Sequence, residues 1–180
     1  EIMDVEFDYI QNIEDMIFLC KRAYGPDYQC NYLFLDFDGV INVPYNDERD
    51  YQEEWVFKAN IYAMDYLNEL CKEFNLKLII SSSWRSMGME WLEEYLRKSG
   101  LDESIKIIGT TDYDDFFRRY QEIYDYLVAH PNFTSLLILD DSPMGPLDKY
   151  LLRTTFDTGF KEEQLLLARE MLTKQLEDTF

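Results

Sequence analysis

Short apolar runs that stop abruptly at polar residues constrain the fold of this chain more than any other feature. Residues 32–35, 76–80 and 136–139 are almost continuously hydrophobic, and each run is followed directly by aspartates or serines. A strand buried on both faces of a parallel sheet has this pattern, whereas a strand with one solvent face alternates apolar and polar residues. The runs therefore predict buried strands of a parallel sheet.

The segments between these runs carry apolar residues at three- and four-residue spacings, which is typical of amphipathic helices. The first such segment ends at Gly25-Pro26 and another at Gly100, residues that commonly terminate helices. Strands that alternate with helices form βαβ units with right-handed crossovers. The sequence therefore predicts an α/β fold, a doubly wound, Rossmann-like parallel sheet with helices on both faces. Helices are expected over 8–24, 53–74, 87–98, 115–129 and 161–176, and further short strands over 105–108 and 152–156.

The length of 180 residues fits one domain and is too short for two ordinary ones. We expect a single domain with an N-terminal helical extension over 1–30, a core over 31–160 that carries the chemistry, and a C-terminal helix over 161–180. No apolar stretch approaches the roughly 20 residues that span a bilayer, so no membrane segment is expected. The three cysteines have no CxxC spacing, which argues against a zinc site or a disulfide framework and favours a reducing, cytoplasmic compartment.

The titratable residues restrict the chemistry further. The only histidine, His130, precedes Pro131 at the end of a predicted helix, where a surface or capping role is expected. Catalysis would then depend on carboxylates. A net charge of −19 repels polyanions and weakens a nucleic-acid function, although a few arginines suffice to hold the end of a strand.

Polar clusters follow the predicted strands at the positions where a ligand would bind. In an open parallel sheet, ligands bind beyond the carboxyl ends of the strands. Asp36 and Asp38 follow the first apolar run, residues 81–83 are serines after the second, and Asp140 and Asp141 follow a later one. We expect all three clusters to meet at one edge of the sheet.

Each of these residue types suits phosphoryl transfer. Asp36 can attack phosphorus and form an acyl phosphate, while Asp38 can protonate the leaving oxygen and later deprotonate water. Several carboxylates facing a dianionic substrate require a cation, and ligands that are all oxygen favour Mg²⁺. The candidate magnesium ligands are Asp36, Asp38, Asp140 and Asp141, and the candidates for phosphate binding are Ser81, Ser82, Arg85 and Arg119, with Arg118 as an alternative to Arg119.

Each cluster also has a purely structural interpretation. An acidic pair after a strand can cap the following helix, and one of the three serines is expected to cap the helix over 87–98. Adjacent arginines on a helix are commonly solvated or paired with a neighbour such as Glu122. The catalytic interpretation therefore depends on all of the clusters reaching the same place.

The order of these motifs resembles the haloacid-dehalogenase-like (HAD) phosphatase superfamily, over residues 31–160 of the chain. Within that superfamily, the chain is similar to the HAD domain of Swiss-army-knife RNA repair proteins. The matching stretches are Leu35-Asp36-Phe37-Asp38-Gly39-Val40-Ile41-Asn42, Ile80-Ser81-Ser82-Ser83-Trp84-Arg85, Arg119-Tyr120-Gln121-Glu122-Ile123, Leu139-Asp140-Asp141 and Thr158-Gly159-Phe160.

The resemblance implies a Mg²⁺-dependent phosphatase in which Asp36 is the nucleophile and the main-chain carbonyl of Asp38 is a metal ligand. It implies that Ser81, or Ser82 if the strand runs one residue longer, and Arg119 occupy the two phosphate-binding positions, although the superfamily often has lysine at the second. Of the later acidic pair, Asp141 is implied as the more direct ligand of Mg²⁺.

The short segment after the first acidic motif implies an open site. About a dozen residues separate Val40 from the predicted helix, which leaves no room for a large cap domain. In this superfamily, an open site implies a macromolecular substrate, or a lid that another chain or the N-terminal helix supplies.

The expected partner is a phosphorylated substrate. The resemblance implies a nucleic-acid end or a nucleotide, and a phosphoprotein phosphatase of the same mechanism is the alternative. A non-catalytic phosphate-binding or interaction module on the same fold is a hypothesis from another functional class. A receiver domain is disfavoured because its phospho-acceptor aspartate follows a later strand, whereas Asp36 follows the first apolar run. The sequence does not fix the oligomeric state.

Overall fold

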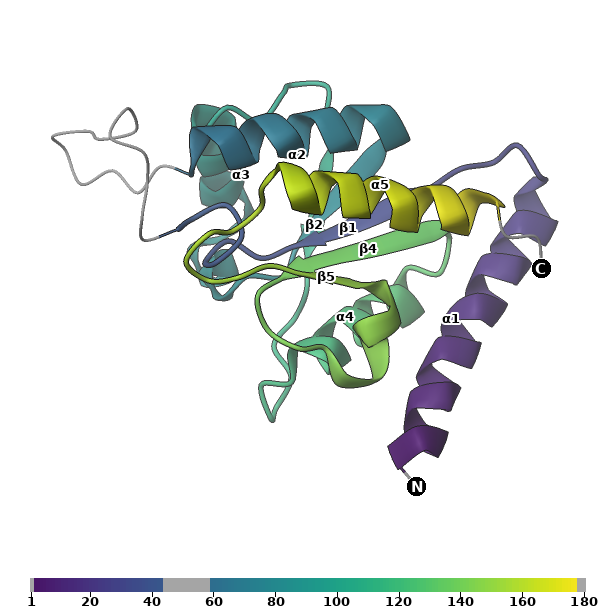
Figure 1. Ribbon diagram of the computed structural model, residues 1–180. Coiled ribbons are helices and arrows are strands. Elements are labelled where there is room, and N and C mark those ends of the chain that lie inside the picture. Colours follow the sequence, from purple (N-terminus) through teal and green to yellow (C-terminus); the bar gives the residue numbers. More distant parts are fainter. Residues whose placement is uncertain (1, 44–58, 178–180) are drawn as a thin grey trace, which may run out of the picture.

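The computed structural model describes residues 2–43 and 59–177, with side chains from residue 8 onward (Figure 1). Within these residues, the centre of the fold is a sheet with the strand order β3-β2-β1-β4-β5, and every pairing is parallel. The chain runs outward from β1 through β2 and β3 on one side and through β4 and β5 on the other. This confirms the predicted doubly wound sheet, with its switch point between β1 and β4. The strands are β1 (Asn31–Leu35), β2 (Leu76–Ile80), β3 (Ile107–Thr110), β4 (Ser135–Asp140) and β5 (Leu151–Arg153).

The three inner strands are almost wholly buried, as the apolar runs predict, and only Lys77 of β2 among their residues is partly exposed. Every residue of β1 and β4 is buried, whereas β3 and β5 at the sheet edges are only partly so. Successive side chains of a strand point to opposite faces of the sheet. Leu33 and Leu35 therefore belong to one apolar core, and Tyr32 and Phe34 to a second core on the other face.

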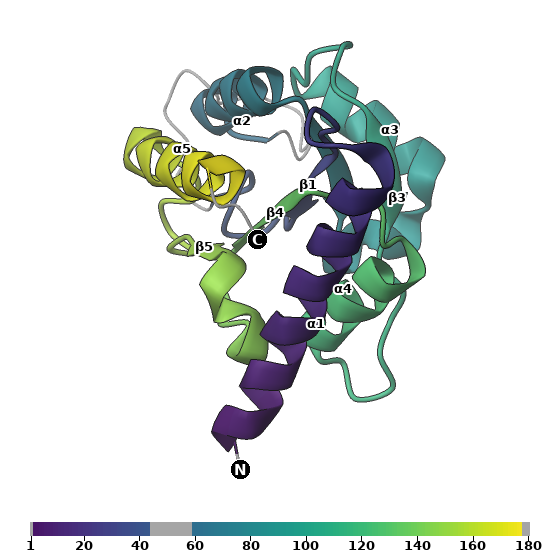
Figure 2. The same cartoon turned by 90° about the vertical axis from the view of Figure 1, so that its right-hand side faces the viewer.

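Helices cover both faces of the sheet (Figures 1 and 2). Helices α2, α3 and α5 contribute to the core that contains Leu33, and α1 and α4 contribute to the core that contains Phe34. No helix in the described ranges is long and apolar enough to cross a membrane. The helices are α1 (Ile2–Tyr24), α2 (Ile61–Phe74), α3 (Met89–Lys98), α4 (Arg119–Ala129) and α5 (Glu162–Glu177), with short 3₁₀ helices η2 (Ser83–Met87) and η3 (Gly145–Tyr150).

The N-terminal helix α1 packs on the face of the sheet that contains Phe34. It leads into the amino end of β1 and packs on η3, where Lys149 Nζ lies 2.9 Å from Glu14 Oε1. Figure 1 shows the C-terminal end of α1 on the side of the sheet where the strands begin. Tyr9 near the start of α1 contacts Tyr120 and Gln121 in the first turn of α4, so a lid supplied by the N-terminal helix stays a prediction.

Helix α4 begins later than its periodicity predicts. The expected start was residue 115, but the first helical residue is Arg119. The carboxylate of Asp114 accepts hydrogen bonds from the main-chain N–H groups of Phe116 and Arg118, and Phe117 has a φ of 55°. This side-chain-closed turn competes with the helical hydrogen bonds and delays the helix.

Other boundaries shift by a few residues. Residues 107–110 and 151–153 form the edge strands, rather than 105–108 and 152–156. Helix α2 begins after Asn60, whose Oδ1 accepts hydrogen bonds from the N–H groups of Tyr62 and Ala63 and so caps the helix. The part of the predicted helix from 53 to 58 lies outside the described residues.

Candidate active site

Main-chain hydrogen bonds continue the sheet one residue beyond its central strands. The N–H of Asp36 donates to the carbonyl of Leu139 at 3.0 Å, and the N–H of Ser81 donates to the carbonyl of Leu35 at 3.0 Å. Asp36 is therefore fixed beside the ends of both neighbouring strands. As the sequence predicts, the polar clusters come together at the carboxyl edge.

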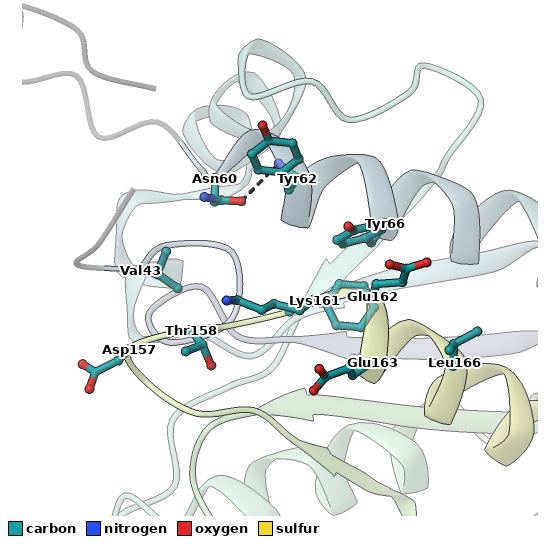
Figure 3. Close-up of a pocket in the computed structure, with 11 residues that line it drawn as sticks. Val43, Asn60, Tyr62, Tyr66, Asp157, Thr158, Lys161, Glu162, Glu163 and Leu166 are labelled. Carbon is teal, nitrogen blue, oxygen red and sulfur yellow. Dashed lines mark hydrogen bonds between the residues drawn. The ribbon is translucent and has the colours of Figure 1, made fainter. Parts of the chain in front are cut away.

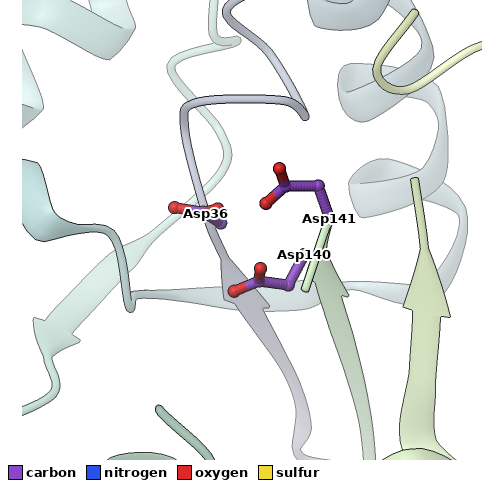
Figure 4. Close-up of side chains that lie close together, drawn as sticks. All are labelled: Asp36, Asp140 and Asp141. Atoms are coloured by element: carbon purple, nitrogen blue, oxygen red, sulfur yellow. The ribbon is translucent and has the colours of Figure 1, made fainter. Parts of the chain in front are cut away.

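Three aspartates form an acidic cluster at this edge (Figure 4). One carboxylate oxygen from each of Asp36, Asp140 and Asp141 lies within 4.8 Å of the others. Asp36 is 6% exposed and Asp140 is 1% exposed. The N–H of Phe37 donates to Asp36 Oδ1 at 2.9 Å, and the N–H of Ser142 donates to Asp140 Oδ1 at 3.0 Å. The cluster has the spacing of oxygen ligands around a hard cation.

Burial and mutual repulsion oppose the ionisation of these carboxyl groups. Burial, followed by the charge of Asp140, raises the pKa of Asp36 to about 8, and the guanidinium of Arg119 offsets this only in part. Burial also raises the pKa of Asp140. At neutral pH, Asp36 therefore holds a proton for much of the time, and a divalent cation in the cluster would displace that proton.

Of the two candidate arginines, Arg119 faces the acidic cluster. Its Nη1 lies 2.9 Å from Asp140 Oδ2 and 3.3 Å from Asp36 Oδ1. Arg118 instead pairs with Asp114, with 2.9 Å between its Nε and Asp114 Oδ2. Arg119 thus places its guanidinium in the site, whereas Arg118 pairs within the turn that precedes α4.

Gly39 allows the loop after β1 to approach the cluster. Its φ is +79°, and a Cβ at this position would lie 2.6 Å from Asp141 Oδ2. A side chain would therefore be strained in the backbone and would also collide with a carboxylate. The Oγ1 of Thr154 donates to the carbonyl of Gly39 at 2.6 Å and holds the loop in place. Sequence reasoning missed Thr154, because nothing in the residues after β5 indicates which loop they touch.

Asp38 is exposed and its carboxylate lies outside the acidic cluster. Trp84 Nε1 donates a hydrogen bond of 2.9 Å to Asp38 Oδ2. The indole thereby orients a carboxylate that remains accessible to solvent. This is a suitable position for a group that exchanges protons with a leaving group or with water. The metal role expected for Asp38 involves its main-chain carbonyl and is not tested by the side-chain geometry.

The serines after β2 have different surroundings. Ser82 caps η2, because its Oγ accepts a hydrogen bond from the N–H of Trp84 at 3.2 Å. Ser81 is fully buried, and its Oγ has no hydrogen-bond partner among the described residues. A buried hydroxyl without a partner is uncommon in a native protein and costs free energy. The hydroxyl of Ser81 is therefore available to donate a hydrogen bond to a ligand, whereas that of Ser82 caps η2.

Arg85 lies inside the protein. Its Nη2 is 2.8 Å from Glu122 Oε2, and its Nη1 donates to the carbonyl of Ser81 at 2.8 Å. The ring of Tyr113 covers the guanidinium, with 3.8 Å from the ring centroid to Cζ. The sequence predicts Arg85 as a phosphate ligand, and it predicts Glu122 only as a partner for the arginines of its helix. The spacing of three residues between Arg119 and Glu122 could have indicated that their side chains pair on one face of the helix.

The donor set fits magnesium. Three carboxylates of the acidic cluster carry three negative charges when ionised, and Arg119 carries one positive charge, which leaves two negative charges. One divalent cation balances this excess. Carboxylate oxygens, with no nitrogen or sulfur ligand in the cluster, are the ligands that Mg²⁺ prefers.

A separate pocket lies on the α2 and α5 side of the loop that follows β1 (Figure 3). Its volume is 690 Å³, and none of the aspartates of the acidic cluster lines it. Lys161, just before α5, lies across this space from Asn60 and Tyr62 at the start of α2, and Glu163 also lines the pocket. The remaining lining residues are Val43, Tyr66, Asp157, Thr158, Phe160, Glu162 and Leu166.

The parallel sheet, the acidic cluster at its carboxyl edge and the absence of a large cap among the described residues define an α/β domain of the HAD type, whose general chemistry is phosphohydrolysis. The comparison with protein families identifies it further. The family described as the HAD domain in Swiss Army Knife RNA repair proteins matches residues 32–165, so the chain belongs to this family. The match confirms the resemblance that the motifs indicate. No curated protein and no solved structure matches the chain.

Proposed function

We propose that this domain is a Mg²⁺-dependent phosphatase that hydrolyses a phosphate monoester through an aspartyl-phosphate intermediate on Asp36. One observation carries the proposal: a buried carboxylate at the end of β1 lies within 4.8 Å of two further carboxylates and 3.3 Å from a guanidinium nitrogen. This arrangement supports a nucleophile, a cation site and a phosphate-binding guanidinium within one small volume.

In the first step, an oxygen of Asp36 attacks phosphorus, the ester P–O bond breaks, and Asp38 gives its proton to the leaving oxygen. In the second step, Asp38 takes a proton from a water molecule that attacks the acyl phosphate, which releases inorganic phosphate and restores the carboxylate. Arg119 and the free hydroxyl of Ser81 would donate to the phosphoryl oxygens in both steps.

Magnesium would be held by Asp36, Asp140, Asp141 and the carbonyl of Asp38, and would neutralise charge on the carboxylates and on the phosphoryl oxygens. In the protein without a cation, the raised pKa of Asp36 keeps the nucleophile largely protonated. Activity should therefore require the cation for the ionisation of Asp36 as well as for the binding of phosphate.

Substitution of the proposed nucleophile tests this mechanism. Asp36→Asn keeps the size of the side chain but cannot form the acyl phosphate, so turnover of an aryl phosphate with Mg²⁺ should fall by at least about a thousandfold. Asp65→Asn, at an exposed position of α2, is the matched control and should keep the wild-type rate. Turnover of Asp36→Asn at the wild-type rate would exclude the mechanism.

The aromatic turn before α4 supports a substrate that contains a nucleobase. Phe116 is 77% exposed and Phe117 is 79% exposed, and both immediately precede the arginine pair that leads to the acidic cluster. Hydrogen bonds to Asp114 hold this turn in shape, so the two rings are displayed to solvent from an ordered segment. Exposed aromatic rings stack on bases without regard to sequence. We therefore propose a nucleotide or a nucleic-acid end as the substrate.

A substrate panel tests this choice. With Mg²⁺ present, Phe116→Ala/Phe117→Ala should raise the KM for a nucleotide or a 3′-phosphorylated oligonucleotide roughly tenfold, because stacking contributes about 1–3 kcal/mol per base. The KM for glycerol phosphate, which has no ring, should change less than twofold in the same variant. A steep loss of oligonucleotide binding with added salt would favour the nucleic-acid end over the nucleotide. Turnover of phosphopeptides alone would favour the phosphoprotein alternative, and phosphate binding without turnover would favour a non-catalytic module.

A further inference from the structure

A buried ion pair contacts both proposed phosphate-binding residues, Ser81 and Arg119. The side chain of Arg85, on η2, is 4% exposed, and that of Glu122, on α4, is 2% exposed. Their closest atoms, Nη2 and Oε2, are 2.8 Å apart. A buried pair is a poor source of net stability, because both charges lose their hydration. Its presence therefore calls for an explanation other than stability.

Glu122 uses both of its carboxylate oxygens to hold neighbouring groups. Oε2 accepts hydrogen bonds from Arg85 and from the main-chain N–H of Asp114, the latter at 2.9 Å. Oε1 faces Nε of Arg119 at 3.7 Å. The guanidinium of Arg119 is thus between two acidic groups, with Glu122 beside Nε and the pair Asp36 and Asp140 beside Nη1.

Arg85 connects the same carboxylate to the turn after β2. Its Nη1 donates to the main-chain carbonyls of Ser81 at 2.8 Å and of Ser82 at 3.4 Å. Through Glu122 and Arg85, the start of α4 is therefore connected to the segment that presents the hydroxyl of Ser81. The two proposed phosphate ligands, Ser81 and Arg119, come from different elements, and this pair is a direct side-chain connection between those elements.

The chemistry distinguishes Glu122 from the other acceptors of Arg119. Asp36 loses its negative charge when it bonds to phosphorus, and a cation in the acidic cluster weakens the attraction of Asp36 and Asp140 for the guanidinium. The charge of Glu122 is unaffected by either event, because it is outside the cluster. Of the three acidic residues that contact Arg119 in the described part of the chain, Glu122 alone neither bonds to phosphorus nor belongs to the proposed cation site.

We propose that Glu122 is a positioning residue that orients Arg119 toward the phosphoryl group, and that Arg85 neutralises and anchors Glu122 rather than binding phosphate itself. This inference rests on the proposed phosphatase function. It assigns Arg85 to the interior support of the site and adds Glu122 to the residues on which the rate depends.

Glu122→Gln is the direct test, because glutamine keeps the shape of the side chain and removes its charge. With an aryl phosphate and saturating Mg²⁺, kcat should fall roughly tenfold to a hundredfold while KM changes less than about threefold, since the lost contact orients a group that acts in the transition state. Glu122→Asp, which keeps the charge, should recover part of the rate. Glu73→Gln removes a carboxylate from the exposed ion pair with Arg169 and is the matched control, with kcat unchanged.

A double variant separates positioning from folding. Glu122→Gln leaves the charge of Arg85 buried without its partner and can lower the melting temperature. Arg85→Met/Glu122→Leu removes both charges, and such replacements often restore or increase stability. We expect this variant to melt closer to the wild type than Glu122→Gln does, but to remain at least tenfold slower. A folded double variant with the wild-type kcat would overturn the proposal.

Nuclear magnetic resonance of the arginine Nε–H groups provides a readout that does not require turnover. The Arg119 signal is assigned by its loss in Arg119→Lys, and its exchange with water should be at least severalfold faster in Glu122→Gln and in the double variant than in Glu73→Gln. Unchanged exchange would also overturn the proposal. If the wild type hydrolyses no phosphate ester, the proposed function fails while this measurement still tests the position of Arg119. If the wild type is active and Glu122→Gln equals it, only the positioning role fails.

Discussion

Polar groups are buried to a similar extent at the two ends of the central strands, but their charges and hydrogen-bond partners differ. At the amino end, Asn31 and Ser135 are both almost fully buried. Asn31 Nδ2 donates to the carbonyl of Phe74 at 2.7 Å, and its Oδ1 accepts from the hydroxyls of Ser135 at 2.6 Å and Thr134 at 3.2 Å. These groups are neutral, and their hydrogen bonds are made within the protein.

At the carboxyl end, buried polar groups lack either full charge compensation or a hydrogen-bond partner among the described residues. Asp36 has a pKa raised to about 8 by burial and by Asp140, and the hydroxyl of Ser81 has no partner among the described residues. A folded protein rarely retains such costs unless a ligand meets them. The difference indicates that the amino end of the sheet serves stability, and it supports the proposal that the carboxyl end binds a cation and a phosphate.

A pair of identical substitutions at the two ends gives the larger expected effect. Ser81→Ala should lower kcat/KM roughly tenfold to a hundredfold, about 1.4–2.7 kcal/mol, because a phosphoryl oxygen loses its donor. Its free energy of unfolding should stay within about 0.5 kcal/mol of the wild type, since the hydroxyl has no partner to lose. Steady-state kinetics and urea unfolding measure the two quantities.

Ser135→Ala is the matched variant at the other end of the sheet. It removes the hydrogen bond to Asn31 and should lower the free energy of unfolding by about 1 kcal/mol while kcat/KM stays within twofold. If Ser81→Ala proves the more destabilising variant, or Ser135→Ala the slower enzyme, the comparison between the two ends is wrong.

The same contrast explains how much of the molecule the sequence could predict. The strands and their common carboxyl edge were predictable because apolar runs of this length have few alternatives to a buried parallel sheet. The acidic cluster was predictable because Asp36 and Asp140 follow directly from those runs. The sheet itself fixes the position of residues that directly follow a strand, so predicting that position needs no information about distant packing.

The supporting residues of the site were not predictable in the same way. Arg85 lies in a short 3₁₀ helix whose direction depends on the cap at Ser82, and the late start of α4 depends on the turn at Asp114. Contacts between η2 and α4 decide whether Arg85 points inward to Glu122 or outward to a ligand. No local sequence pattern predicts these contacts. The choice of Arg119 over Arg118 as the group facing Asp36 has the same origin.

The smallest expected effect concerns pH and magnesium, and it sharpens the interpretation of the carboxyl end. The pKa of Asp36 in the folded protein, about 8, is above the ordinary aspartate value of 3.8. Without a cation, the folded state therefore binds more protons than the unfolded state between about pH 4 and pH 8, so stability is highest below this range and falls as pH rises through it. The raised pKa of Asp140 acts in the same direction.

Magnesium competes with these protons, so it should stabilise the protein more at pH 8 than at pH 6. We expect Mg²⁺, relative to a chelator, to raise the melting temperature by about 2–4 °C more at the higher pH, the shift that roughly 1 kcal/mol produces in a domain of this size. Differential scanning calorimetry measures it. In Asp36→Asn, which has no carboxyl to titrate at this position, the difference between the two pH values should shrink. A magnesium effect that is equal at both pH values, or larger at pH 6, would mean that the cation does not replace a proton on Asp36, and the unmet charge at the carboxyl end would then need another ligand.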